Sequence, residues 1–531
     1  MSCPAPLSIT DLFDPAADVL AEVSDHLYGQ LLAWLLIAVG IWFTVRTRGL
    51  QFRLFGQMLR AIAGSRAGGE GISSFQAFTI GLASRVGTGN IVGVALAITL
   101  GGPGAVFWMW VVALVGMATA FFEATLAQIF KVRAPDGSFR GGPAFYMARG
   151  MGGAGGRVMA GVFAVITLVT CGFIITSVQS NAVAGTLVAA LGGGEGSALP
   201  GFGGLSAAQL VVAGLVLVLT AVVVFGGIRA VARVTEWMAP VMALIYIVLV
   251  AVVCLLNLGD FWRVIGWIIS SAFAPEPLVG GLGGGVLAAV INGTKRGLFS
   301  NEAGQGTAPN AAATATVAHP VQQGLIQSLG VFVDTVVVCT ATAFVILIAG
   351  PAVWNAPGAN PSTLTTLAIA HGLGGWTVLP MAVLIFVLAY SSIIAAYVYT
   401  DVNMDYLTGG RRWASWTVRV VSVASATAGA VLSLDVVWNA VDIAMAVMTL
   451  TNLVALIRLH RWGAGALRDY EDQLRAGAAE PVFRGRDNPR LPGDVPGGVW
   501  SSSDDVTATD DADESAPAPP AASPAPATTE D

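Results

Sequence analysis

The stretch Gly87-Thr88-Gly89-Asn90 lies between two apolar segments, residues 75–83 before it and residues 91–100 after it. Together these segments have the length of a transmembrane helix, which needs about 20 apolar residues. Each glycine inside a helix costs about 1 kcal/mol relative to alanine, and lipid offers no partner for the N–H and C=O groups that a break releases. The stretch therefore predicts a helix that is interrupted within the membrane, where it lines a cavity or binds a ligand.

The composition predicts an all-α polytopic membrane protein. Of the 531 residues, 55% are hydrophobic and 11% are charged, whereas soluble domains contain about 25% charged residues. The 65 glycines are typical of closely packed transmembrane helices. The sequence does not show the alternating ten-residue strands of a transmembrane β-barrel.

Hydropathy divides the chain into about eleven predicted spans. They are 28–46, 75–100, 104–130, 156–188, 207–227, 234–256, 281–315, 321–350, 375–400, 414–433 and 436–459. Residues 1–27 then form an extracellular N-terminal segment, residues 28–462 the transmembrane domain, and residues 463–531 a cytoplasmic tail. This tail is predicted to be disordered and acidic from about residue 499, because its end is rich in Ala, Pro, Ser and Asp.

The distribution of basic residues predicts the orientation of the spans. Arginine and lysine cluster in the loops after spans one, three, five, nine and eleven, whereas loops 189–206 and 351–374 contain none. Basic loops stay in the cytoplasm. We therefore expect a multi-pass protein of the plasma (inner) membrane with its N-terminus outside and its C-terminus in the cytoplasm.

A second polar, glycine-rich stretch runs from Asn292 to Gly306 within the seventh span. Spans two and seven are five apart, so they cross the membrane in opposite directions. Two broken helices at corresponding places of two oppositely oriented halves indicate an inverted-repeat transporter with its binding site between the breaks. The halves would be about 72–256 and about 280–460. The alternative is that such small-residue stretches are helix-packing surfaces.

Longer motifs resemble a known family. The stretch from Gly101 to Gly116 resembles the signature of the sodium:alanine symporters, also called the alanine/glycine:cation symporter family, and residues 86–91, 142–147, 296–306 and 334–342 are similar to its other blocks. The resemblance covers about residues 30–460. It implies a leucine-transporter-like fold of two inverted five-helix repeats with one extra N-terminal helix. It also implies that alanine or glycine is imported with sodium by alternating access.

Two features depart from the family pattern. The ninth span ends in Thr400-Asp401, where family members usually have a Tyr-Tyr-Gly-Glu-like stretch, and Arg85 places a cation beside the first break. Proton-coupled transport of a small amino acid is therefore kept as an alternative, and an ion channel as a less favoured one.

The first break has the chemistry for an amino-acid zwitterion. Free N–H groups and the positive end of the helix dipole near Gly89 suit a carboxylate. The predicted substrate-binding residues are Gly87, Thr88, Gly89 and Asn90 at the first break, Thr170 and Cys171 in the fourth span, and Asn292, Gly293 and Thr294 at the second break. For Thr170 and Cys171, simple helix packing is an equal alternative.

The resemblance also implies a sodium site. By analogy with the fold it would combine the carbonyl groups of Ala83 and Val86 with the hydroxyls of Ser391 and Ser392, because sodium is a hard cation that prefers oxygen ligands. Alternatively, each serine hydroxyl bonds a carbonyl group of its own helix.

Charged residues inside a membrane are functional hypotheses by default. Asp334 lies well inside the eighth span, where it could relay an ion or a proton. We favour instead an ion pair of Asp334 with Arg85, Lys295 or Arg296. Glu123, near the inner end of the third span, is expected to meet basic residues of a loop.

The end of the second polar stretch offers a gate. Residues 299–302, which include Asn301 and Glu302, are candidates for an inner gate that closes the site toward the cytoplasm.

Other function classes lack their sequence signals. No nucleophile with a base and no cluster of histidines with carboxylates is visible, since the four histidines lie in predicted tails or loops. A phosphate-binding loop of an ATP-driven pump and a filter-like channel motif are also absent from the sequence. We expect no enzyme activity and no cofactor other than sodium as coupling ion. The expected partners are a small neutral amino acid, sodium and lipid, and not nucleic acid.

Overall fold

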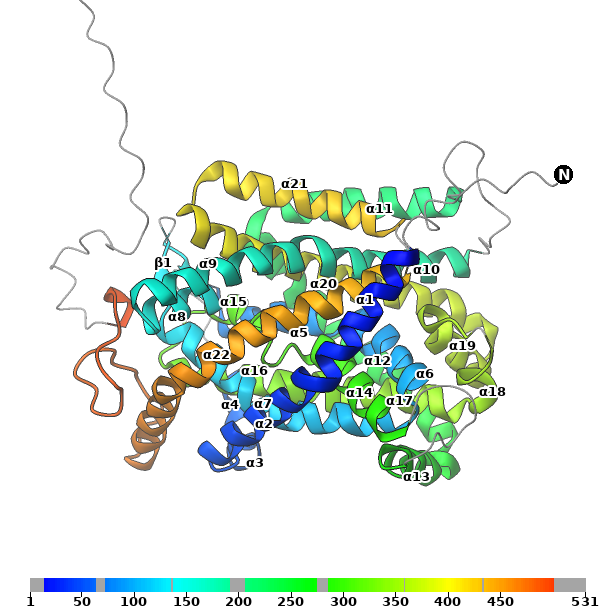
Figure 1. Ribbon diagram of the computed structural model, residues 1–531, viewed down its shortest axis with the longest axis horizontal. Helices are drawn as coiled ribbons and strands as arrows, with labels where there is room; N and C mark the ends of the chain where they lie inside the picture. The colour runs from blue at the N-terminus through cyan, green and yellow to red at the C-terminus, as the bar shows by residue number, and fades with distance from the viewer. Residues whose placement is uncertain are drawn as a thin grey trace, which may run out of the picture.

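The structure is a computed structural model that describes residues 14–63, 72–134, 137–191, 206–274, 285–357, 359–431 and 434–500. Most of its long helices lie side by side across the view of Figure 1. Helix α8, strand β1 and the end of α22 lie on the left, and α13, α18 and α19 lie on the right. The predicted disorder from residue 499 falls largely outside the described residues.

The first half of the chain begins with one long helix. It consists of α1 (Asp14–Leu27), the π-helical turn η1 (Tyr28–Leu32) and α2 (Ala33–Arg46), and is followed by the short α3 (Leu50–Arg53) and α4 (Phe55–Ala63). The broken span comes next, as α5 (Ser74–Arg85), the π-helical turn η2 (Gly89–Gly93) and α6 (Val94–Gly101). Its two parts are bent by 45°.

Helix α7 (Gly104–Ile129) forms the centre of the fold, since every residue from Gly116 to Ile129 is buried. An antiparallel hairpin of β1 (Val132–Arg133) and β2 (Phe139–Arg140) follows it. The remaining elements of this half are α8 (Pro143–Gly150), α9 (Gly153–Val169), η3 (Thr170–Ile175), α10 (Thr176–Ala190), α11 (Ala207–Val224), α12 (Gly227–Leu256), η5 (Leu258–Asp260) and α13 (Phe261–Ala272).

The second half repeats this alternation of long and interrupted helices. Its elements are α14 (Gly285–Asn301), α15 (Ala308–Ala312), α16 (Pro320–Val331), η6 (Phe332–Cys339), α17 (Thr340–Ile348), α18 (Pro351–Trp354), α19 (Pro361–Leu373), η7 (Gly375–Thr377), α20 (Val378–Thr408), α21 (Arg412–Gly429), α22 (Leu434–Arg475) and η8 (Gly498–Trp500).

The described helices support a multi-pass membrane protein. Eight of them are long and apolar enough to cross a membrane, or nine if the bent pair α5–α6 counts as one span. The predicted spans 281–315 and 414–433 do not reach this threshold within the described residues: α14 has only 17 residues, and α21 is much less hydrophobic. Large apolar side chains are exposed on α11 and α12, including Val222, Trp237 and Leu244, which is expected of a surface that faces lipid.

Candidate functional site

The predicted first break is confirmed. Helix α5 ends at Arg85, and π-helical hydrogen bonding begins at Gly89. All residues of the break are buried, so its released backbone groups need partners within the protein.

Side-chain amides bond the N–H groups of the break, and the N–H of Gly87 also donates to the Arg85 carbonyl at 2.9 Å. The N–H of Gly87 donates to Oδ1 of Asn90 at 2.9 Å, and the N–H of Thr88 donates to Oε1 of Gln179 at 3.2 Å. The Thr88 hydroxyl donates to the same Oε1 at 2.8 Å. Gln179, on α10, was not among the predicted site residues.

Asn90 joins three spans. Its Nδ2 donates to Asp334 Oδ1 at 2.6 Å and to Ser300 Oγ at 3.0 Å, and it lies 3.2 Å from Cys339 Sγ. The Ser300 hydroxyl in turn donates to Asp334 Oδ2 at 2.7 Å. The break in η2 thus contacts α14 and η6 through a fully buried polar cluster.

The predicted ion pair of Asp334 is wrong. Within the described ranges its side-chain partners are the neutral groups Asn90, Ser300 and Thr335. Lys295 and Arg296 instead face α1 and α22. Arg296 pairs with Asp442, and Lys295 Nζ lies 2.5 Å from Asp25 Oδ1 and 3.9 Å from Asp442 Oδ2.

Aromatic residues extend this charged cluster toward the break. The Trp438 ring lies 4.8 Å from the Arg296 guanidinium and 4.8 Å from the Phe299 ring. Phe299 also closely approaches Gly89, where a Cβ atom would lie 2.9 Å from its ring. The side of the break that faces α22 is therefore covered by an aromatic pair under an ion pair.

The residues of the expected sodium site lie together. The Ser391 and Ser392 hydroxyls, on α20, lie 3.0 Å and 2.9 Å from the Ala83 carbonyl oxygen at the end of α5. A Cβ atom on Gly87 would collide with the Ser392 hydroxyl, so this oxygen cluster adjoins the first break. Both hydroxyls also donate to Leu388 of their own helix, which is the packing alternative. Val86, the fourth predicted ligand, is buried three residues after Ala83, and among the described residues no hydrogen bond joins its carbonyl group to either serine.

The second interruption lies at the C-terminal end of the predicted stretch from Asn292 to Gly306, and the predicted site at Asn292 to Thr294 is helical. Helix α14 continues through Asn292, Gly293 and Thr294 and ends at Asn301. The Asn292 amide bonds the Ala288 carbonyl of its own helix. A Cβ atom on Gly293 would lie 2.5 Å from the backbone oxygen of Ala105. The small residues here allow close packing against α7, and Asn292 also packs against Gly101 at the end of α6. Among the described residues, no side-chain hydrogen bond joins them to the first break.

The true second interruption spans residues 302–307. Glu302 has a left-handed backbone with φ of 57°. Its carboxylate accepts hydrogen bonds from Ser84, from Thr307 at 2.8 Å and from Tyr399 at 3.3 Å. The gate candidates Asn301 and Glu302 thus tie this interruption to α5 and α20.

Arg85 lies at the junction of the two interruptions. It is only 1% exposed, and its Nε donates to the Asn301 carbonyl at 3.0 Å. Arg85 therefore joins the end of α5 to the end of α14 through a backbone hydrogen bond.

Glu123 does not meet a basic loop, so that expectation is wrong. Its carboxylate accepts hydrogen bonds from the N–H groups of Gly304 and Gly306, both at 2.9 Å, and from Asn452 at 2.7 Å. A carboxylate on α7 thus satisfies the free backbone groups of the second interruption.

Thr170 and Cys171 begin the π-helical turn η3 and are fully buried. The following Gly172 packs against Thr400 on α20. Among the described residues, no side-chain hydrogen bond joins either residue to the first break.

Three comparisons with known proteins agree. A family model described as the sodium:alanine symporter family matches residues 14–485. The amino-acid carrier protein AlsT of Bacillus subtilis is 42% identical over 89% of this chain and 96% of its own length. The sodium/alanine symporter AgcS of Methanococcus maripaludis is 35% identical over 82% of this chain and 93% of its own length. The crystal structure of MhsT in complex with L-phenylalanine covers 73% of this chain and 89% of its own, with a TM-score of 0.51 and 16% identity.

Proposed function

Because this chain belongs to the sodium:alanine symporter family, we propose that it imports alanine or glycine together with sodium by alternating access. The protein is a multi-pass membrane transporter and not an enzyme, and sodium-coupled transport of an amino acid is the activity of its family. Its leucine-transporter-like, all-α fold is that of MhsT. Alanine or glycine as the substrate and alternating access as the transport cycle are what we propose beyond the activity of the family.

One observation carries the proposal: a place for an anion adjoins a place for a cation. The N–H groups of Gly87 and Thr88 bond neutral amide oxygens, which a substrate carboxylate can replace. The Ser392 hydroxyl contacts Gly87 and the Ala83 carbonyl oxygen. Opposite charges attract strongly in a buried site, so a bound carboxylate and a bound sodium ion would each raise the affinity for the other.

The surroundings of the break favour a small amino acid. Gly87 and Gly89 have no room for a side chain because Ser392 and Phe299 press against them. Asp334, bonded to Asn90 and Ser300, supplies a negative charge for the substrate ammonium group. We assign Gly87, Thr88, Gly89 and Asn90 to the substrate and the oxygens around Ser391 and Ser392 to sodium.

Two clusters are the proposed gates. The outer gate consists of Arg296, Asp442, Trp438 and Phe299, and the inner gate joins Glu302 to Ser84 and Tyr399. Phe299, which we expected at the inner gate, belongs to the outer one here because it packs against Trp438. Opening one gate while the other stays closed gives alternating access between the repeats at about 72–256 and 280–460. In this proposal the protein lies in the plasma membrane. Its N-terminus is outside the cell, and its tail from residue 463 is in the cytoplasm.

Uptake of labelled alanine into proteoliposomes tests the proposal. An inward sodium gradient should drive accumulation, and unlabelled glycine should compete with alanine for uptake. Removing sodium from both sides should abolish accumulation. Absence of sodium-driven accumulation of both labelled alanine and labelled glycine, in proteoliposomes that contain the folded protein, would refute the substrate assignment.

Proton coupling is the second candidate, and Asp334 is the observation that favours it. This buried carboxyl group bonds neutral partners and could carry a proton across the membrane. Accumulation of alanine under a pH gradient in sodium-free buffer, lost in Asp334→Asn, would establish proton coupling and exclude obligatory sodium coupling.

A further inference from the structure

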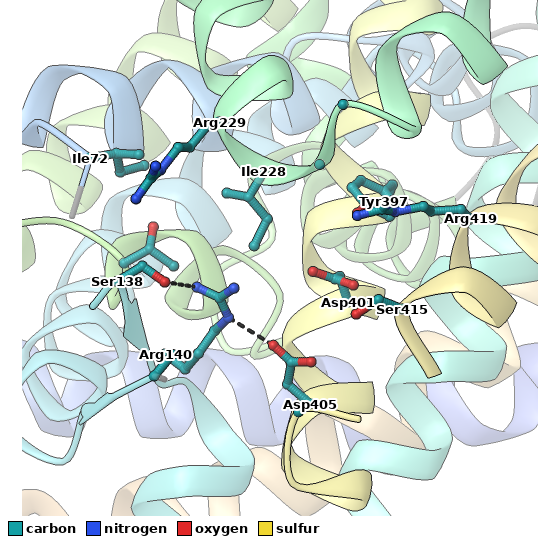
Figure 2. Close-up of a pocket in the computed structure, with 15 residues that line it drawn as sticks. Ile72, Ser138, Arg140, Ile228, Arg229, Tyr397, Asp401, Asp405, Ser415 and Arg419 are labelled. Carbon is teal, nitrogen blue, oxygen red and sulfur yellow. Dashed lines mark hydrogen bonds and ion pairs between the residues drawn. The ribbon is translucent and has the colours of Figure 1, made fainter. Parts of the chain in front are cut away.

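A cavity of about 380 Å³ lies apart from the first break, at the end of the molecule that carries the β-hairpin. It is lined by the β-hairpin, the turn between α11 and α12, and the ends of α20 and α21 (Figure 2). Its volume lies within the usual range of small-molecule sites, about 300–1,000 Å³. None of the residues that line it belongs to the proposed sodium or substrate site.

Two of the charged residues that line the cavity, Arg140 and Asp405, form an ion pair with each other. Arg140 Nε lies 2.9 Å from Asp405 Oδ2, and its Nη1 donates to Ser138 Oγ at 2.7 Å. Figure 2 shows this pair below the centre of the cavity. Arg140 and Asp405 thus shape the cavity without adding net charge.

The remaining charged groups are of both signs. Asp401, on α20, is only 5% exposed. Ser415, on α21, bonds its carboxyl group, but Oδ1 of Asp401 has no hydrogen-bond partner among the described residues. Within the same part of the chain, Nε of Arg419 is also without a partner. Arg229 lines the cavity from the start of α12. A buried carboxylate oxygen without a donor is costly, so Oδ1 of Asp401 is available to accept a hydrogen bond from a group in the cavity.

We propose that this cavity binds a free α-amino acid from the cytoplasm. The ammonium group would donate to Asp401, and the carboxylate would accept from Arg229, which lies across the cavity from Arg419 and Tyr397 (Figure 2). A simple anion would be repelled by Asp401, and a simple cation would be repelled by the two arginines. A zwitterion satisfies both signs at once.

The position of the cavity suggests a regulatory consequence, which rests on the proposed function. Asp401 lies nine residues after Ser392 on the same helix, or about 13 Å along its axis. A ligand here would bridge α20 to the start of α12. Holding these helices together should slow uptake, so the imported amino acid would inhibit its own entry from the cytoplasmic side.

Binding in sodium-free buffer separates this cavity from the central site. Radiolabelled alanine is the probe, with the full-length protein in detergent at millimolar ligand. We expect saturable binding that Asn90→Ala retains. Asp401→Asn and Arg229→Gln should each weaken it by at least about tenfold, the loss of one charged hydrogen bond. Arg412→Gln, an exposed arginine at the start of the neighbouring α21, is the matched control and should bind as the unmodified protein does.

These binding measurements test the proposed site in the cavity independently of the central site. Absence of saturable alanine binding without sodium, or binding unchanged in both Arg229→Gln and Asp401→Asn, would overturn the proposal. Since Arg229 is exposed, its variant decides the matter even if Asp401→Asn fails to fold. Failure of sodium-driven uptake, with cavity binding intact, would refute the proposed transport function and leave the amino-acid site standing.

Discussion

Both helix interruptions release backbone N–H groups that need a partner inside the protein, but different side chains accept their hydrogen bonds. At the first, the N–H groups of Gly87 and Thr88 bond the neutral amide oxygens of Asn90 and Gln179. At the second, the N–H groups of Gly304 and Gly306 bond the carboxylate of Glu123.

This difference indicates that the first interruption binds the substrate and that the second stabilises the fold. Hydrogen bonds to a charged group are about twice as strong as neutral ones, so the loop at residues 302–307 is held firmly between α7 and α22. The neutral amides at the first interruption can be displaced by a substrate carboxylate, which brings a charge of its own. We therefore expect damage to the second interruption to unfold the protein, and damage to the first to stop transport.

Glu123→Gln should have the largest effect on stability. The amide replaces one acceptor by a donor and leaves a buried N–H group without a partner, which should lower the free energy of unfolding by about 3 kcal/mol. Thermal unfolding in detergent, followed by size-exclusion chromatography, measures the loss. The control is Glu236→Gln, a partly buried carboxylate that accepts a hydrogen bond from the Gln76 side chain at 3.0 Å and bonds no backbone N–H group of an interruption among the described residues. Equal stability of the two variants would remove the distinction between the interruptions.

Asn90→Ala should reduce alanine uptake by at least about 50-fold, because two or more hydrogen bonds of the site are lost, with a smaller loss of stability than in Glu123→Gln. Initial uptake rates in proteoliposomes at matched protein content measure the effect. Asn292→Ala is the matched control, since that amide bonds only its own helix at Ala288. An equal loss of uptake in both variants would contradict the placement of the site.

Ser392→Ala should raise the sodium concentration for half-maximal uptake by about threefold to tenfold, as expected for one lost oxygen ligand worth about 1 kcal/mol. The maximal rate should fall less. Ser270→Ala provides the control, because that exposed hydroxyl bonds only carbonyls of its own helix. An unchanged sodium curve in Ser392→Ala would remove this serine from the proposed ion site.

A last prediction concerns pH at the flank of the second interruption. Lys131, beyond the end of α7, donates to the Ala315 carbonyl at 2.9 Å, and burial lowers its pKa from 10.5 to about 7. Between these values the unfolded chain binds one more proton than the folded protein. Stability should therefore rise from pH 7 toward pH 10 by up to about 1.4 kcal/mol per pH unit.

Thermal unfolding across this range tests the Lys131 effect. Lys131→Met removes the titrating group and should flatten the profile, whereas the protein with Lys131 should become more stable as the pH rises. Identical slopes for the two proteins would show that Lys131 is not the group responsible.

The local sequence was sufficient to predict the first helix break, where glycines interrupt the helix. Gly87 and Gly89, which alternate with the polar Thr88 and Asn90, predicted the first break. The predicted cluster of the Ala83 carbonyl oxygen and the two serine hydroxyls of α20 is also present in the structure. The same reasoning failed at Asn292 to Thr294, because small polar residues also allow helices to pack closely. Which role applies depends on the face that a neighbouring helix covers.

The partners of the interruptions could not be predicted from spacing. Gln179 follows Thr88 by 91 positions, and Gly304 follows Glu123 by 181. No periodicity links such residues, and a lone buried Gln or Glu is equally compatible with many contacts. The expected ion pair of Asp334 failed for the same reason, since Lys295 and Arg296 turn to Asp442 and Asp25.

The sequence by itself determined that the protein is a polytopic helical membrane protein with a broken second span, since hydropathy and glycine placement act locally along the chain. Its motifs also indicated the family. Only the tertiary structure decided which groups satisfy the broken backbone: amides at one interruption and a carboxylate at the other. The physical reason is that lipid leaves every released N–H to be paired within the protein, and packing of distant helices selects the partner.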